Sequence, residues 1–148
     1  MRYVKIIAVL LVLAYIGRVV YFETWLGITQ PESDRTMMLT TFDDDGEGHD
    51  RVVTQIWVDD ELYVGVNHWP RLWYWRLQSN PEVEITMDGE TRRYRATRVE
   101  GETFERVDEA RPLSLSFRFK AGFPPRRIVH LEPLETQEPD AVAEQSVL

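Results

Sequence analysis

The sequence predicts a mainly β domain, a six-stranded antiparallel β-barrel with short helices, preceded by one N-terminal hydrophobic helix. Three observations predict this fold. An unbroken apolar run lies near the N-terminus, short β-branched or alternating segments follow one another between turn residues, and Asp88-Gly89 is a strong signal for a two-residue hairpin. A small antiparallel sheet best avoids unpaired edges by closing on itself, so we expect a barrel rather than an open sheet.

The N-terminal apolar run predicts a single membrane anchor. Ile6–Gly17 is apolar without interruption, and the longer segment Val4–Phe22 approaches the roughly 20 residues that a spanning helix needs. Lys5 and Arg18 lie near its ends, where long basic side chains can reach the headgroups. A cleaved signal peptide fits less well because no small-x-small site follows, and a buried soluble helix is the third alternative. Arg2 and Lys5 favour a cytoplasmic N-terminus with the domain outside, whereas Arg18 argues against that orientation.

The segments after the anchor predict six strands and three short helices. Alternation or β-branched residues predict strands at Thr36–Phe42, Arg51–Val58, Glu61–Asn67, Glu82–Met87, Thr91–Val99 and Arg126–Pro133. Helices are expected within Pro70–Asn80, Gly101–Ala110 and Pro112–Gly122. The chain should therefore divide into a membrane anchor (1–22), a connector (23–35), the barrel domain (36–133) and an acidic disordered tail (134–148).

Length and charge limit the classes of function. The 148 residues fit one domain, and the formal net charge of −8 disfavours nucleic acid, because an acidic chain gains nothing from counterion release at phosphates. The absence of Cys excludes disulfides, thiolate metal sites and cysteine nucleophiles. A local anion site remains compatible with the acidic total because arginines cluster at Arg92, Arg93, Arg95, Arg98, Arg126 and Arg127.

Familiar catalytic and metal motifs do not fit the sequence. The acidic turn Asp43–Gly48 would need ligands at Thr41 and Val52 to complete a calcium loop, so a solvated hairpin tip is the better interpretation. No G-x-S-x-G or phosphate-cradling glycine motif is present. Metal-ligand spacing is also missing among His49, His68 and His130. We therefore expect no catalytic side chain and no metal ligand.

The unusual stretch begins where the third predicted strand ends. Asn67, His68, Trp69 and Arg71 follow that strand at once, and residues at strand ends are where sites are commonly built. Arg71 could bind a phosphate and Trp69 could line a flat ring. The alternative is that Arg71 is a surface cation and that the tryptophans only pack the next helix on the barrel, namely Trp69, Trp73 and Trp75.

This stretch resembles the deazaflavin-dependent nitroreductase family, also called the quinone reductase family. That family belongs to the flavin-reductase-like split barrels, which are related to pyridoxamine phosphate oxidase. The resemblance covers roughly residues 36–133 and rests on the order and spacing of four motifs: Leu39-Thr40-Thr41, Pro70-Arg71-Leu72-Trp73-Tyr74, Asn80-Pro81-Glu82-Val83 and Asp88-Gly89.

The resemblance implies a split barrel, often a homodimer, with FMN or a deazaflavin (coenzyme F-420) in a groove beside the third strand and the following helix. By position, the cofactor-binding residues would be Asn67, His68, Trp69, Pro70, Arg71 and Trp73. The chain departs from the family at one place. Family members that use the deazaflavin carry a basic turn after the first strand, whereas Asp43–Gly48 here is acidic and would repel the acidic tail of that cofactor.

The sequence thus leads to a membrane-anchored split-barrel oxidoreductase that uses a flavin or deazaflavin, with a quinone or a nitro compound as substrate. Such a cofactor performs the redox step itself, which agrees with the missing catalytic motifs. The alternative is a non-catalytic split-barrel protein that binds a ligand or partner at the membrane. A third hypothesis is a haem or lipid binder that uses the same groove, with His68 as axial ligand.

Overall fold

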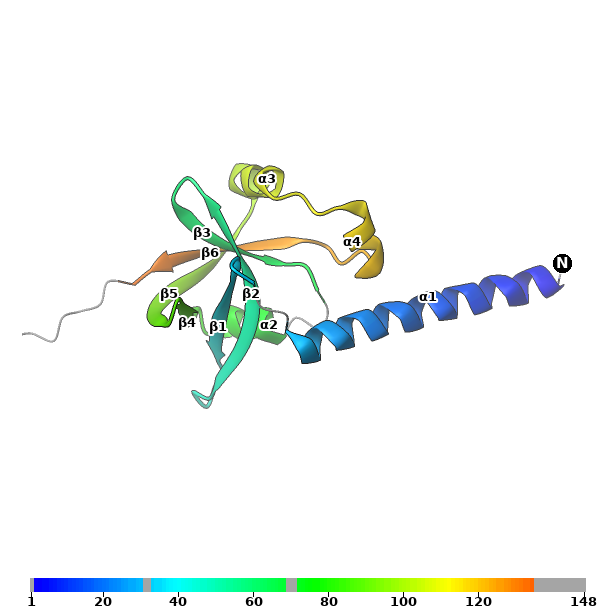
Figure 1. Cartoon of the computed structure of the whole chain (residues 1–148), viewed down its shortest axis with the longest axis horizontal. Helices are drawn as coiled ribbons and strands as arrows, with labels where there is room; N and C mark the ends of the chain where they lie inside the picture. Colours follow the sequence, from blue (N-terminus) through cyan, green and yellow to red (C-terminus); the bar gives the residue numbers. More distant parts are fainter. Residues whose placement is uncertain (1, 31–32, 69–71, 135–148) are drawn as a thin grey trace, which may run out of the picture.

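Short alternating strands form a closed antiparallel barrel in the computed structural model of the chain, which describes residues 2–30, 33–68 and 72–134 (Figure 1). The fold predicted from the sequence is confirmed. The elements, in chain order, are α1 (Arg2–Thr29), β1 (Thr36–Phe42), β2 (Gly48–Val58), β3 (Glu61–Val66), α2 (Leu72–Ser79), β4 (Glu82–Met87), β5 (Glu90–Val99), α3 (Gly101–Ala110), α4 (Leu115–Lys120) and β6 (Arg127–Pro133).

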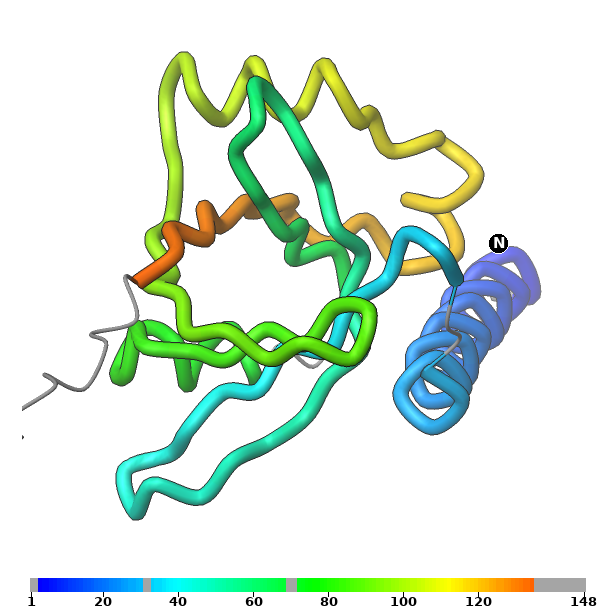
Figure 2. The backbone as a smooth tube through the Cα atoms, turned by 60° about the vertical axis from the view of Figure 1, so that its left-hand side comes forward, coloured from blue at the N-terminus to red at the C-terminus, as the bar shows by residue number. Residues whose placement is uncertain are grey.

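The barrel closes in the order β1-β2-β3-β6-β5-β4, with β4 paired back to β1. The Asp88-Gly89 turn joins β4 to β5, and both residues have the positive φ that this hairpin turn requires. Strand β2 begins at Gly48, earlier than the predicted Arg51, because Gly48 pairs with Phe42 and extends the ladder. The β1–β2 hairpin consequently projects beyond the rest of the barrel (Figure 2).

Alternation along the strands fills the barrel interior. In β1 the buried residues are Met37, Leu39 and Thr41, and in β4 they are Val83 and Ile85, because successive side chains of a strand point to opposite faces. Helix α2 contributes Tyr74 and Leu77 to the same core, which also contains Leu62, Val64, Val66, Tyr94, Ala96, Val129 and Leu131. A smaller cluster lies under α3, where Val107 packs with Ile56, Tyr63 and Ile128.

Helix α1 is longer than the predicted anchor. It continues through Glu23–Thr29, which were expected to belong to the connector, and Gly27 does not end it because one helical glycine costs only about 1 kcal/mol. The segment Tyr3–Thr29 is long and apolar enough to cross a membrane, a property that a signal sequence shares. Its first half extends away from the barrel, and its second half lies against the domain (Figure 1).

Candidate functional site

A groove lies where the last turns of α1 meet β2, the end of β3 and the start of α2. It consists of two hollows of about 150 and 410 Å³, which share Arg51 and Trp73 in their walls. The first hollow is further lined by Leu26, Gln30, Thr36, Val52, Val53, Thr54, Gly65, Asn67 and His68. The second is further lined by Gly27, Gly48, His49, Asp50, Leu72 and Arg76. Together their volumes lie within the range of typical small-molecule sites, about 300–1,000 Å³.

Three of the six predicted cofactor-binding residues lie in this groove. Asn67, His68 and Trp73 line the first hollow, at the end of β3 and on the first turn of α2. The other three, Trp69, Pro70 and Arg71, lie outside the described residues, and their role stays a prediction. The groove therefore forms at the strand end that the sequence indicated.

Asn67 reaches the groove because the residue two positions before it has no side chain. A Cβ added at Gly65 would lie 2.8 Å from Asn67 Nδ2, so glycine leaves the space into which the amide folds. The amide oxygen Oδ1 is buried and accepts no hydrogen bond from any described residue. A buried acceptor without a donor costs about 1–3 kcal/mol, so Asn67 is poised to accept a hydrogen bond from a ligand.

Arg51 is a groove residue that the sequence did not single out. It lies on β2, paired with Leu39 of β1, and its Nη1 donates a hydrogen bond to the carbonyl oxygen of Gly27 at 3.2 Å. Arg76, on α2, lines the second hollow together with Arg51. A guanidinium held by a backbone carbonyl in a groove is well suited to bind a phosphate. The sequence predicted Arg51 only as the first residue of a strand. The strand register is needed to show that its side chain faces the groove.

The end of α1 forms one wall of the groove. Gln30 Oε1 accepts a hydrogen bond from the backbone N–H of Val52 at 2.8 Å, which ties the helix end to β2. Glu23 is buried, and its carboxylate lies 3.4 Å from Nδ1 of His68. The end of α1, which was predicted to be connector, is therefore in direct contact with the predicted site.

The tryptophans of α2 differ in environment. Trp73 is half-buried and packs against the barrel core, as the packing interpretation expected, but it also lines both hollows. Trp75 is 52% exposed, and the guanidinium of Arg127 lies 5.4 Å from its ring centroid. Trp73 is therefore the aromatic residue through which α2 would contact a ligand.

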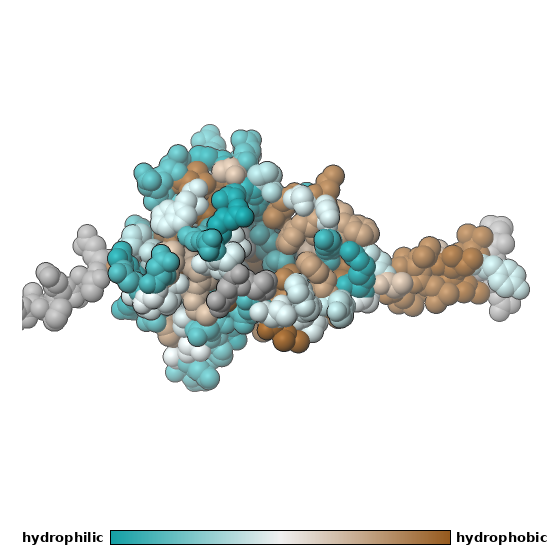
Figure 3. Space-filling model, in the orientation of Figure 1, coloured by the Kyte–Doolittle hydropathy of each residue, from teal (hydrophilic) through white to brown (hydrophobic). Residues whose placement is uncertain are grey.

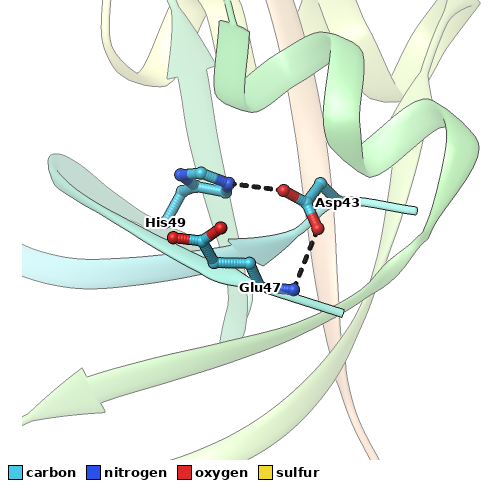
Figure 4. Close-up of side chains that lie close together, drawn as sticks. All are labelled: Asp43, Glu47 and His49. Atoms are coloured by element: carbon cyan, nitrogen blue, oxygen red, sulfur yellow. Dashed lines mark hydrogen bonds and ion pairs between the residues drawn. The ribbon is translucent and has the colours of Figure 1, made fainter. Parts of the chain in front are cut away.

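The acidic hairpin tip is organised by hydrogen bonds (Figure 4). Asp43 Oδ1 accepts from the N–H groups of Asp45 and Glu47, and Oδ2 lies 2.9 Å from His49 Nε2. The hydrogen bond to His49, followed by the N–H of Glu47, lowers the pKa of Asp43. Ligating atoms of Asp43, Glu47 and His49 lie within 4.8 Å of one another, a grouping that the calcium test on the sequence did not reach. The hydrogen bonds of Asp43 explain why these groups lie close together, so we interpret them as part of a hairpin tip.

A second polar cluster lies at the opposite end of β3, under α3. The hydroxyl of Tyr63 donates to the carboxylate of Glu61, and Arg106 donates to Asp59 and, at 3.4 Å, to the Tyr63 oxygen. The hydrogen bond from Tyr63 lowers the pKa of Glu61, while burial, followed by the same hydrogen bond, raises the pKa of Tyr63. In contrast to Asn67, the buried hydroxyl here has its partners.

Fold and groove together define a split-barrel protein with a ligand-sized groove beside β3 and an apolar N-terminal helix. No protein-family model and no curated protein matches the sequence. Among solved structures, the chain is similar to an F420-H2 dependent reductase, FDR-A, with 18% identity over 66% of this chain and 94% of that one and a TM-score of 0.54.

Two other solved structures have the same barrel. HutZ, the haem storage protein from Vibrio cholerae, shares 18% identity over 70% of this chain and 84% of its own, with a TM-score of 0.54. A protein described as a domain-swapped dimer shares 18% identity over 82% and 96%, with a TM-score of 0.55. At these identities the likeness concerns the fold, and it confirms the split barrel that the resemblance implied.

Proposed function

We propose that the chain is a membrane-anchored oxidoreductase that binds a flavin-type ring, FMN or a deazaflavin, in the groove beside β3. One observation carries the proposal. The buried Oδ1 of Asn67 accepts no hydrogen bond from the described residues, and it shares a hollow with an aromatic ring, Trp73, and a cation, Arg51.

These three groups match the three parts of a flavin nucleotide. The polar edge of the ring carries an N–H between two carbonyls, which an amide such as Asn67 can pair with through its own oxygen and NH₂ group. Trp73 offers apolar contact to the ring, and Arg51 offers a charge-assisted hydrogen bond to the phosphate. When bound, the ring supplies the hydride or electron step. Trp69, Pro70 and Arg71, which lie between Asn67 and α2, complete the proposed site.

The charge of the hairpin tip favours FMN over the deazaflavin. Asp43 and Asp44 line a further hollow on the outer side of α2, next to Leu72 and Arg76. A cofactor with an acidic tail that runs past α2 would meet these carboxylates, whereas FMN ends at one phosphate near Arg51. Arg76 is outnumbered by the carboxylates of Asp43 and Asp44 in this hollow, so the tail of the deazaflavin would meet a net negative charge.

The anchor suggests the substrate class. A groove with α1 as one wall lies near lipid if α1 spans the membrane, so we propose a membrane-soluble quinone as substrate, with nitro compounds second. We also propose a homodimer, which the neighbour described as a domain-swapped dimer supports.

A second candidate is a ligand-binding protein without redox activity, and haem is its most specific form. His68 lies in the groove with the Glu23 carboxylate near Nδ1, and a carboxylate commonly orients a metal-ligating histidine in this way. The structural similarity to HutZ makes the same suggestion.

The test is a titration of FMN, the deazaflavin and haem into the full-length protein in detergent, followed by absorbance. We expect FMN to bind at micromolar concentration and Arg51→Ala to weaken binding about ten- to a hundredfold, the value of one charge-assisted phosphate contact. The same loss is expected for Arg71→Ala.

Arg92→Ala is the matched control, because Arg92 is exposed on the β5 hairpin and pairs with Glu90. If neither FMN nor the deazaflavin binds below the millimolar range, and Arg51→Ala has no effect, the oxidoreductase proposal is rejected. A Soret band that is lost in His68→Ala would select the haem binder.

A further inference from the structure

The part of α1 that stands free of the domain is too short to cross a bilayer alone. Tyr3–Ala14 is exposed along its whole length, and at 1.5 Å per residue it measures about 18 Å. The hydrocarbon core of a bilayer is about 30 Å thick. If α1 spans, residues beyond Ala14 must also enter the membrane, together with whatever part of the domain is packed against them.

That part of the domain is α4 and the turn after it. The hydroxyl of Tyr15 donates to the carbonyl oxygen of Phe119 at 2.9 Å, and the two rings lie 4.9 Å apart. Four residues later, Val19 lies so close to Gly122 that a Cβ there would approach within 2.8 Å. Contacts spaced four residues apart on α1 fix α4 along one face of the helix.

The outward surface of α4 is apolar and basic. Leu115, Phe119 and Phe123 are 75%, 49% and 51% exposed, and Arg118 and Lys120 are exposed between them. Hydrophobic surface gathers over α4 on the side of the domain toward α1 (Figure 3).

A third basic residue joins this surface from α1. The guanidinium of Arg18 lies 5.2 Å from the centroid of the Phe119 ring. Arg18, Arg118 and Lys120 give this surface three cations, although the chain has a net charge of −8. Apolar rings mixed with Arg and Lys are typical of surfaces that lie at the headgroup boundary of a membrane.

We propose that α4 and its following turn form a second membrane contact, which enters the leaflet on the domain's side of the membrane and binds anionic headgroups. Leu115, Phe119 and Phe123 enter the acyl boundary, and Arg18, Arg118 and Lys120 meet the phosphates. The bilayer surface is favoured as the occupant because the patch continues the apolar face of α1 and its charge complements anionic lipid.

The proposal rests on the anchoring part of the proposed function, not on the cofactor. It adds that the domain lies directly against the membrane. Phe117 of α4 packs edge-on against His68 at 5.1 Å, so this contact also brings the groove to the membrane surface.

Because the chain has no Cys, single cysteines can report depth in the full-length protein. The variants Leu115→Cys and Phe123→Cys, labelled with an environment-sensitive fluorophore, are placed in nanodiscs of phosphatidylcholine and phosphatidylglycerol with spin-labelled quencher lipids. Val9→Cys on the free half of α1 and Asp44→Cys at the hairpin tip are the membrane and water references. We expect strong quenching and blue-shifted emission at 9, 115 and 123, and neither at 44.

The outcomes separate the two proposals. If position 9 is quenched but positions 115 and 123 are as exposed to water as position 44, the α4 contact is overturned and the anchor remains supported. Quenching at 115 and 123 without quenching at 9 supports the contact and rejects the span. No quenching at any position rejects both.

The charge component has its own variant. Arg118→Glu with Lys120→Glu is expected to reduce quenching at 115 in anionic nanodiscs and to leave quenching at 9 unchanged. Equal quenching at 115 with and without these substitutions would overturn the part of the proposal that assigns anionic headgroups.

Discussion

The two ends of β3 carry polar clusters of opposite character. Under α3, the buried hydroxyl of Tyr63 bonds with Glu61 and Arg106. At the groove, Asn67 Oδ1 is equally removed from water and has no partner among the described residues. A satisfied buried network stabilises a fold, whereas a half-satisfied one costs stability and persists where a ligand completes it. The comparison assigns structure to the first cluster and binding to the second.

The largest expected effect tests the structural cluster. Tyr63 is 1% exposed, so Tyr63→Ala removes a fully buried ring and should lower the free energy of unfolding by about 3–5 kcal/mol. Urea unfolding of the full-length protein in detergent measures this. Trp57→Ala is the control, because Trp57 is 52% exposed on the neighbouring strand and should change little. A stable Tyr63→Ala variant with weakened FMN binding would reverse the assignment of the two clusters.

The next effect tests the groove, and its sign is opposite. Asn67→Leu replaces an unsatisfied amide with an apolar group of similar size and should raise the free energy of unfolding by about 1–3 kcal/mol. The same variant should lose FMN binding, because the ring edge loses its partner. The urea midpoint and an FMN titration on one preparation measure both changes. A destabilised Asn67→Leu variant would show that Asn67 holds the fold together.

The smallest effect is a pH dependence at the structural cluster. The hydrogen bond from Tyr63 holds the pKa of Glu61 below the ordinary value of 4.5. A carboxyl with a lowered folded-state pKa contributes stability above its unfolded value and loses it as the pH falls through the folded value. As the pH is lowered below about 4.5, the urea midpoint should therefore decrease more steeply in the unmodified protein than in Glu61→Gln. Parallel curves would remove Glu61 from the cluster.

Much of the fold followed from local sequence patterns, because alternation and turn residues act over short distances. The strands Thr36–Phe42 and Glu82–Met87 and the helix Gly101–Ala110 agree with the structure at both ends. The extension of α1 through Glu23–Thr29 could not be predicted from the sequence, because Gly27 locally indicates a helix break. The helix end is held instead by contacts with β2.

The site was predictable only in part. Asn67, His68 and Trp73 were found because polar residues directly after a strand mark a strand end. Arg51 and His49 were missed because their roles depend on register: Arg51 faces the groove, and His49 meets Asp43 across the hairpin. Register is a property of two strands and cannot be read from one.

The wall that α1 contributes to the groove has a consequence for how this protein can be handled. A helix that only tethers a domain can be cut away to obtain a soluble fragment with an unchanged site. Here a fragment that begins after Gln30 would lack Leu26 and Gln30, expose the Val52 N–H and free the Arg51 guanidinium. Such a fragment would present a wider and more basic groove than the intact chain. Affinities measured on it would describe a different binding site.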